Sequence, residues 1–192
     1  MIPARQGGEP GAGRILPSLV TAALVPLGCG ARPNYNAGMY SPLLFLHSWL
    51  RWVVLLTGIF AVVKAVGGMN GKRAWAPADA RAGLFFIISC DLQLLIGLAL
   101  YLVFSPTVQA AFGNIGAAMR NPEYRFYVVE HAVGMIIAIA LAHVGRVRSK
   151  KARTDAAKFK GAAIFYGLAL LIVLASIPWP GMPAGRPLLR GL

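Results

Sequence analysis

The residues with the clearest chemical potential are the three histidines of the chain, His47, His131 and His143, which all fall inside long apolar segments. His47 lies about five residues into the first apolar segment, and His131 lies about five residues into the third. If both segments run in the same direction, a rise of about 1.5 Å per residue places both imidazoles at one depth, roughly 8 Å below the surface. Two imidazoles at one depth on separate helices are what a haem with two axial nitrogen ligands requires.

This histidine pair leaves other interpretations open. Structural histidines satisfied by hydrogen bonds, a metal ion and a proton path all fit the same residues. Small residues follow His131 at helical spacing, namely Gly134, Ala138 and Ala142, and Gly58 follows His47 in the same way. Such a stripe lets a flat ring approach the backbone, but it equally lets helices pack without a cofactor. A c-type haem attachment is excluded, because the chain has no Cys-x-x-Cys-His sequence.

A second polar group is formed by Arg51 and Asp91, which both fall near the middle of apolar segments. Neither charge is tolerated alone in hydrocarbon, so we expect an ion pair, or a hydrogen-bonded network that includes Gln93. Such a pair would fix the register of two helices, and the alternative is a role in proton transfer. Arg51 also has the chemistry to contact a haem carboxylate, but such carboxylates usually point towards the nearer surface, where Arg120 and Arg125 are better placed.

Two further ionisable residues lie in the third apolar segment. Glu130 precedes His131 and points about 100° away from it around a helix, so we expect it to be solvated or to bond a tyrosine such as Tyr127. His143 has no further histidine as a partner for a second haem. We interpret His143 as an interfacial side chain near Arg146.

The elements that must position these residues are membrane-spanning helices. The chain has 192 residues, of which 57% are hydrophobic and only 13% are charged, and its mean hydropathy is +0.64. These values exclude an ordinary soluble domain and, for most of the length, disorder. The two cysteines, Cys29 and Cys90, are too few for a disulfide scaffold. Four segments are long enough to cross a bilayer, which takes about 20 apolar residues: residues 42–66, 83–104, 126–147 and 162–177.

We therefore expect an all-α integral membrane four-helix bundle over residues 39–180, followed by a short C-terminal tail over residues 181–192. Residues 1–38 are rich in Gly, Pro and Arg, and their one apolar stretch contains Pro17 and Pro26. We expect these residues to form a disordered tail. The alternatives are a processed signal and a reading frame opened too early, with the functional chain beginning near Met39.

The net charge of +13 is unevenly distributed over the connections between the spans. Under the positive-inside rule, the basic first and third connections lie in the cytoplasm and both ends of the bundle lie outside. Topology thus accounts for the charge, and we expect no nucleic-acid partner, because most of the basic residues have no aromatic neighbours. The basic residues of the third connection are Arg146, Arg148, Lys150, Lys151, Arg153, Lys158 and Lys160.

Several short motifs resemble a family of small four-helix bacterial membrane proteins that are often labelled cytochrome b. The resemblance covers residues 39–180. It is carried by Leu46-His47-Ser48-Trp49-Leu50-Arg51-Trp52, Asp91-Leu92-Gln93-Leu94-Leu95-Ile96-Gly97, Tyr101, Ser105-Pro106, Arg125-Phe126, Val129-Glu130-His131, Lys160, Ile164-Phe165-Tyr166 and Ile177-Pro178-Trp179.

The resemblance implies that His47 and His131 are haem ligands, with Arg51, Gln93 and Glu130 as the polar residues around a haem b. It also implies a bacterial inner membrane. A looser similarity exists to haem A synthase, another membrane bundle with histidines on helices that run from outside to inside. Only one haem pair is available in this chain, so the synthase activity is not transferred to it.

The resulting expectation is an electron-transfer subunit that binds one haem between the first and third spans, near the outer face. One haem near one surface cannot carry an electron across the whole bilayer, so a partner is expected: a periplasmic redox protein, a quinone or a larger respiratory complex. The alternative is a cofactor-free membrane protein for assembly, anchoring or transport, with an intramembrane Arg–Asp pair. The sequence contains no catalytic nucleophile or phosphate-binding loop that would define an enzyme.

Overall fold

The computed structural model describes residues 37–189, so the expectations for residues 1–36 lie outside the described part of the chain. In this part the protein is helical and contains no strand, which confirms the all-α fold. The four long helices are α1 (Ala37–Val66), α2 (Pro77–Ala99), α6 (His131–Lys151) and α7 (Asp155–Ser176).

These helices, with the turns that extend two of them, are long and apolar enough to cross a membrane, as the sequence predicts for a multi-pass membrane protein. The four segments are Gly38–Val66, Pro77–Phe104, Pro122–Lys151 and Asp155–Ser176. The last one begins seven residues earlier than predicted. The reason is local: the Thr154 hydroxyl accepts a hydrogen bond from the Ala157 N–H at 3.3 Å, and Asp155 supplies a negative charge in the first turn.

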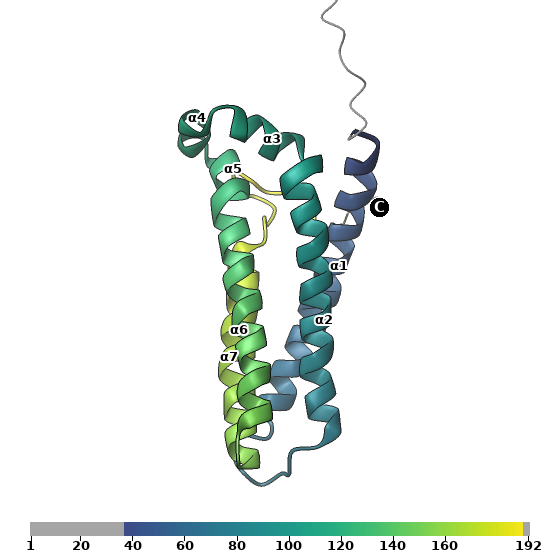
Figure 1. Cartoon of the computed structure of the whole chain (residues 1–192), viewed down its shortest axis with the longest axis vertical. Coiled ribbons are helices and arrows are strands. Elements are labelled where there is room, and N and C mark those ends of the chain that lie inside the picture. Colours follow the sequence, from purple (N-terminus) through teal and green to yellow (C-terminus); the bar gives the residue numbers. More distant parts are fainter. Residues whose placement is uncertain (1–36, 190–192) are drawn as a thin grey trace, which may run out of the picture. The chain divides into compact units, whose positions relative to one another are not determined.

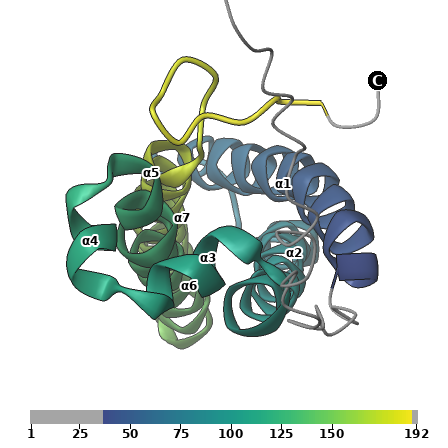
Figure 2. The ribbon, with the colours of Figure 1, turned by 90° about the horizontal axis from the view of Figure 1, so that it is seen from above.

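The four helices form a bundle in which α1 packs against α2 and α7, while α6 packs closely along α7 and more loosely against α2 (Figures 1 and 2). The small residues after His131 belong to the close α6–α7 contact. Ala138 and Ala142 are buried, and a Cβ on Gly134 would collide with the Ser176 side chain. The stripe therefore serves helix packing.

The connection between α2 and α6 is more structured than the sequence indicates. It contains three short helices, α3 (Pro106–Gly113), α4 (Ile115–Arg120) and α5 (Pro122–Arg125), which cover one end of the bundle (Figure 1). The side chains of Ser105, Asn114 and Asn121 cap their N-termini. We call this end the α3–α5 end.

The helices α2 and α6 are each joined to the α3–α5 end by a π-helical turn. The turn η1 (Leu100–Phe104) ends α2, and the turn η2 (Phe126–Glu130) leads into α6. The two turns are tied together, because the Tyr101 hydroxyl donates a hydrogen bond to the Val128 carbonyl at 2.9 Å. Each turn is wider than an α-helical turn and so changes which side chains face the interior.

Residues 177–189, which we call the C-terminal segment, form a closed loop beside the bundle (Figure 2). The Arg186 N–H donates to the Pro178 carbonyl at 3.1 Å and closes the loop. Glycine is required at two positions: Gly181 has a φ of +92°, and a Cβ on Gly185 would lie 2.6 Å from the Trp179 carbonyl oxygen. The sequence indicated only a short tail from residue 181.

Candidate functional site

The structure brings His47 of α1 and His131 of α6 together near the α3–α5 end. Their ring centroids are 6.3 Å apart and the ring planes are inclined by 70°. A bond from a metal to an imidazole nitrogen is about 2 Å long, and the centroid lies roughly 1 Å beyond the nitrogen. Two rings on opposite sides of one metal therefore have centroids about 6 Å apart. The observed separation matches this value.

His131 is oriented by the end of α7. Its Nδ1 lies 2.7 Å from the Ser176 carbonyl oxygen. A carbonyl oxygen only accepts hydrogen bonds, so Nδ1 carries the proton and donates it. The neutral ring then has a free lone pair on Nε2, which is the form that binds a metal.

His47 is held by α2. The Gln93 side-chain amide donates to the His47 carbonyl at 2.9 Å, which fixes the helix turn that carries the imidazole. Gly97 lies against the ring itself, and a Cβ at this position would be 3.1 Å from His47 Cε1. The His47 Nδ1 is buried and has no hydrogen-bond partner in the described part of the chain.

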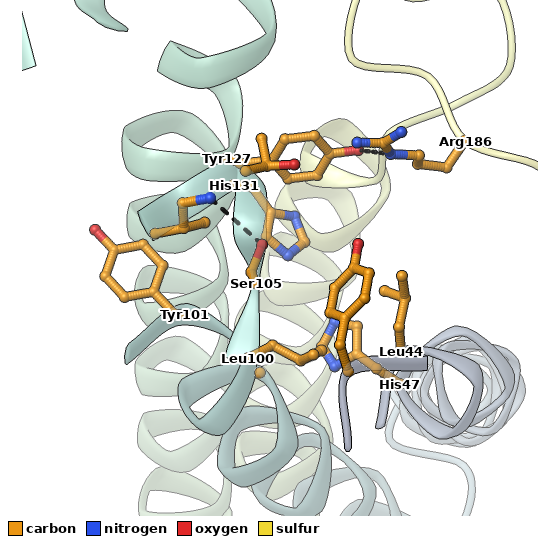
Figure 3. Close-up of a pocket in the computed structure, with 12 residues that line it drawn as sticks. Leu44, His47, Leu100, Tyr101, Ser105, Tyr127, His131 and Arg186 are labelled. Carbon is orange, nitrogen blue, oxygen red and sulfur yellow. Dashed lines mark hydrogen bonds between the residues drawn. The ribbon is translucent and has the colours of Figure 1, made fainter. Parts of the chain in front are cut away.

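Free space adjoins the histidine pair on several sides, in three cavities that are all lined by both His47 and His131. The first has a volume of about 100 Å³ and lies under the α3–α5 end (Figure 3). The second, of about 80 Å³, lies towards α7 and the C-terminal segment. The third, of about 220 Å³, is lined mainly by apolar residues of α2 and α6.

Several residues that line the second cavity have buried polar atoms without hydrogen-bond partners. Within residues 37–189, the buried side-chain atoms that lack a hydrogen bond are His47 Nδ1, Arg51 Nε, Gln93 Oε1 and Asp79 Oδ1. Asp79 Oδ1 is 3.2 Å from the Lys64 ammonium, so it is paired. The other three belong to residues that line the second cavity. Because unsatisfied buried polar atoms are costly, their convergence is typical of a binding site.

The predicted pairing of Arg51 with Asp91 is wrong. The Arg51 Nη2 donates instead to the Leu188 carbonyl at 2.5 Å. Ser89 and Gln93 of α2 form hydrogen bonds with α1, and Asp91 lies two residues from each of them. Two residues correspond to about 200° of helix rotation, so Asp91 faces away from α1.

Asp91 contacts His143 of α6, with Oδ1 2.9 Å from Nε2. The sequence did not predict this contact of His143, and its expected position at the interface near Arg146 stays a prediction. About half of each side chain in this pair is exposed on the surface of the bundle. Neither residue lines the three cavities around His47 and His131.

Glu130 does not join the group either. It forms an ion pair with Arg125 at 2.8 Å, and about half of its side chain is exposed. Of the residues that the sequence indicated, the structure thus assembles His47, His131, Arg51 and Gln93, and it leaves Glu130 outside.

Sequence reasoning missed two residues of the site, Tyr127 and Arg186. The Tyr127 hydroxyl donates to the Ala184 carbonyl at 2.7 Å. It accepts a hydrogen bond from Arg186 Nε at 2.8 Å, which Figure 3 shows. Tyr127 precedes His131 by four residues, so helical spacing was a usable signal for it. Arg186 had no such signal, because a loop positions it.

Among residues 37–189, no group of three or more His, Cys, Asp or Glu is arranged to hold a metal ion. A haem needs only two axial ligands from the protein, because its macrocycle supplies the others. No protein-family model matches the chain, and neither does any curated protein or solved structure.

Proposed function

We propose that this protein is a membrane-embedded electron-transfer subunit similar to b-type cytochromes. His47 and His131 would hold one haem b between α1 and α6, near the α3–α5 end. The observation that carries the proposal is the 6.3 Å separation of the two imidazole centroids. The resemblance of residues 39–180 to small membrane proteins labelled cytochrome b points to the same function.

The residues around the pair have separate tasks. The Ser176 carbonyl holds His131 in the tautomer that leaves Nε2 free, and Gln93 fixes the turn of α1 that carries His47. Gly97 provides room beside the His47 ring. The bound haem supplies one-electron chemistry, and burial together with the nearby Arg51 charge sets its potential.

The charge distribution supports an orientation for this subunit. The basic connections after α1 and α6 are on the cytoplasmic side of a bacterial inner membrane, and the α3–α5 end faces outside. A haem held by His47 and His131 would lie within reach of a partner on the same side: a periplasmic redox protein, a quinone or another subunit of a respiratory complex.

The optical spectrum of the purified protein tests the proposal. Protein from haem-replete cells should show a Soret band and a sharp α band on reduction. The variants His47→Ala and His131→Ala should each lose these bands. His143→Ala is the matched control, because this third histidine pairs with Asp91 outside the cavities, and it should keep the spectrum.

Size-exclusion chromatography in detergent establishes that each variant is folded. A folded, colourless wild-type protein would contradict the proposal and leave a cofactor-free membrane bundle. Unchanged spectra in both ligand variants would show that the haem is held by other residues.

A further inference from the structure

The two cavities that reach the C-terminal segment have a positive lining. Arg186 lines both of them, and Arg51 lines the second. None of the residues that line either cavity is acidic. The guanidinium groups of Arg51 and Arg186 thus offer hydrogen-bond donors to an anionic group beside the histidine pair.

Arg186 is held firmly in this position, as Figure 3 shows for its contact with Tyr127. Its Nε donates to the Tyr127 hydroxyl and its Nη2 to the Glu123 carboxylate, both at 2.8 Å. The guanidinium also lies 5.2 Å from the centroid of the Tyr127 ring. Arginine has further N–H donors, and these two bonds leave the rest for a ligand.

Arg186 is also reliably charged. Burial alone would lower its pKa, but the contacts with Tyr127 and Glu123 offset this and raise the pKa above its ordinary value. Only about a third of the side chain is exposed, which limits the competition of water for its donors.

Arg51 positions the segment that carries Arg186. The Arg51 Nη2 and the Trp52 indole N–H both donate to the Leu188 carbonyl, at 2.5 Å and 3.3 Å. Arg51 is only 9% exposed, and its Nε has no partner in the described residues. It therefore fixes the C-terminal segment and adds a second positive charge to the cavity.

We propose that Arg186 binds the carboxylate groups of the haem, and that the C-terminal segment is thus part of the binding site. This inference rests on the proposed function. A haem carries carboxylates at one edge of the macrocycle, and a guanidinium binds a carboxylate through charge-assisted, paired hydrogen bonds.

The test compares haem b with its dimethyl ester, which has the same ring and iron but no carboxylate charge. Both are titrated into the full-length apoprotein in detergent, and the Soret band reports binding. Wild type should bind haem b roughly 10- to 100-fold more tightly than the ester. Arg186→Gln should lose most of this preference while it binds the ester as wild type does. Arg120→Gln, an exposed arginine of α4, is the control and should keep the preference.

The outcomes separate the two proposals. If wild type binds neither porphyrin, the proposed function fails. If Arg186→Gln keeps the full preference for haem b, or weakens both porphyrins equally, the role of Arg186 fails while haem binding stands. If Arg186→Gln does not fold, Arg186→Lys replaces it. This variant keeps the charge but not the paired donors, so the preference should shrink, and an unchanged preference would overturn the inference.

Discussion

At the scale of single residues, α6 carries two histidines whose surroundings give them different roles. His131 donates from Nδ1 to the Ser176 carbonyl and keeps Nε2 free beside three cavities. His143 lies three turns further along the helix and uses Nε2 to contact the Asp91 carboxylate on the bundle surface. The acceptor that each ring meets therefore decides which nitrogen remains available for a ligand.

Gly97 provides a test of the space beside His47. Gly97→Ala adds a Cβ 3.1 Å from His47 Cε1, so the ring must move by a few tenths of an ångström. We expect a several-fold loss of haem affinity and a cost of about 1 kcal/mol in stability. Gly167→Ala is the control, because nothing lies within 4 Å of its added Cβ. Equal haem titrations for both variants would show that the ring position is not critical.

The Asp91–His143 pair predicts a distinct pattern of stabilities. Asp91→Leu or His143→Leu leaves a polar partner alone on a membrane-spanning surface, at a cost of roughly 1–3 kcal/mol. The double variant with leucine at both positions should be more stable than either single one, because no polar group is left unpaired. Unfolding in detergent micelles measures this, and haem content should be unchanged. Additive effects in the double variant would mean that the two residues do not interact.

At the scale of elements, the site depends on helix ends that deviate from α-helical geometry. The turns η1 and η2 lie at the ends of α2 and α6 next to the cavities, and they carry Tyr101 and Tyr127. Such wide turns are frequent at functional sites, since they redirect side chains without breaking the helix. Here they direct Tyr127 towards the C-terminal segment and Tyr101 towards η2.

The link between the two π-helical turns predicts a stability effect. Tyr101→Phe removes the hydrogen bond to the Val128 carbonyl and should lower the free energy of unfolding by about 1 kcal/mol. Thermal unfolding in detergent measures the loss. Tyr124→Phe is the matched control, because the structure gives its hydroxyl no hydrogen bond within residues 37–189, and its melting temperature should equal that of wild type. The same shift in both variants would contradict the role of the bond.

The positions of the helices could be predicted from the sequence better than the direction in which their side chains point. Hydropathy predicts four helices, because a span needs a long apolar run whatever it packs against. It does not predict which face of α2 carries Asp91, since that depends on how Ser89 and Gln93 dock on α1. It also gives no sign of Arg186, whose position depends on a loop closed by backbone hydrogen bonds. The sequence does predict that His47 and His131 lie at the same depth, because depth follows from residue count alone.

At the scale of the whole molecule, the two ends of the bundle differ in charge. The end opposite α3–α5 holds the basic connections and the buried Asp79, which is paired with Lys64 and Arg73. Basic residues favour the cytoplasmic side because they are retained there during insertion.

Cysteine labelling on intact cells tests whether the basic end of the bundle lies in the cytoplasm and the α3–α5 end lies outside. Cys90 is only 2% exposed and should not be labelled. Single cysteines can therefore be introduced in a Cys29→Ala background. A membrane-impermeant maleimide should label Gly116→Cys in α4 from outside. It should label Lys72→Cys and Arg153→Cys only after the cells are permeabilised. The reverse pattern would invert the orientation and move the candidate site to the cytoplasmic side.

The contact between Arg51 and the Leu188 carbonyl also constrains the order of events during biosynthesis. The two residues are 137 positions apart, so all four spanning helices are made before Leu188 leaves the ribosome. His131, the second histidine of the pair, precedes Leu188 by 57 residues, which take roughly 3–11 s to translate at about 5–20 residues per second. During this interval both histidines have been made but the C-terminal loop has not yet docked, so the cavity that this loop borders is still open on that side.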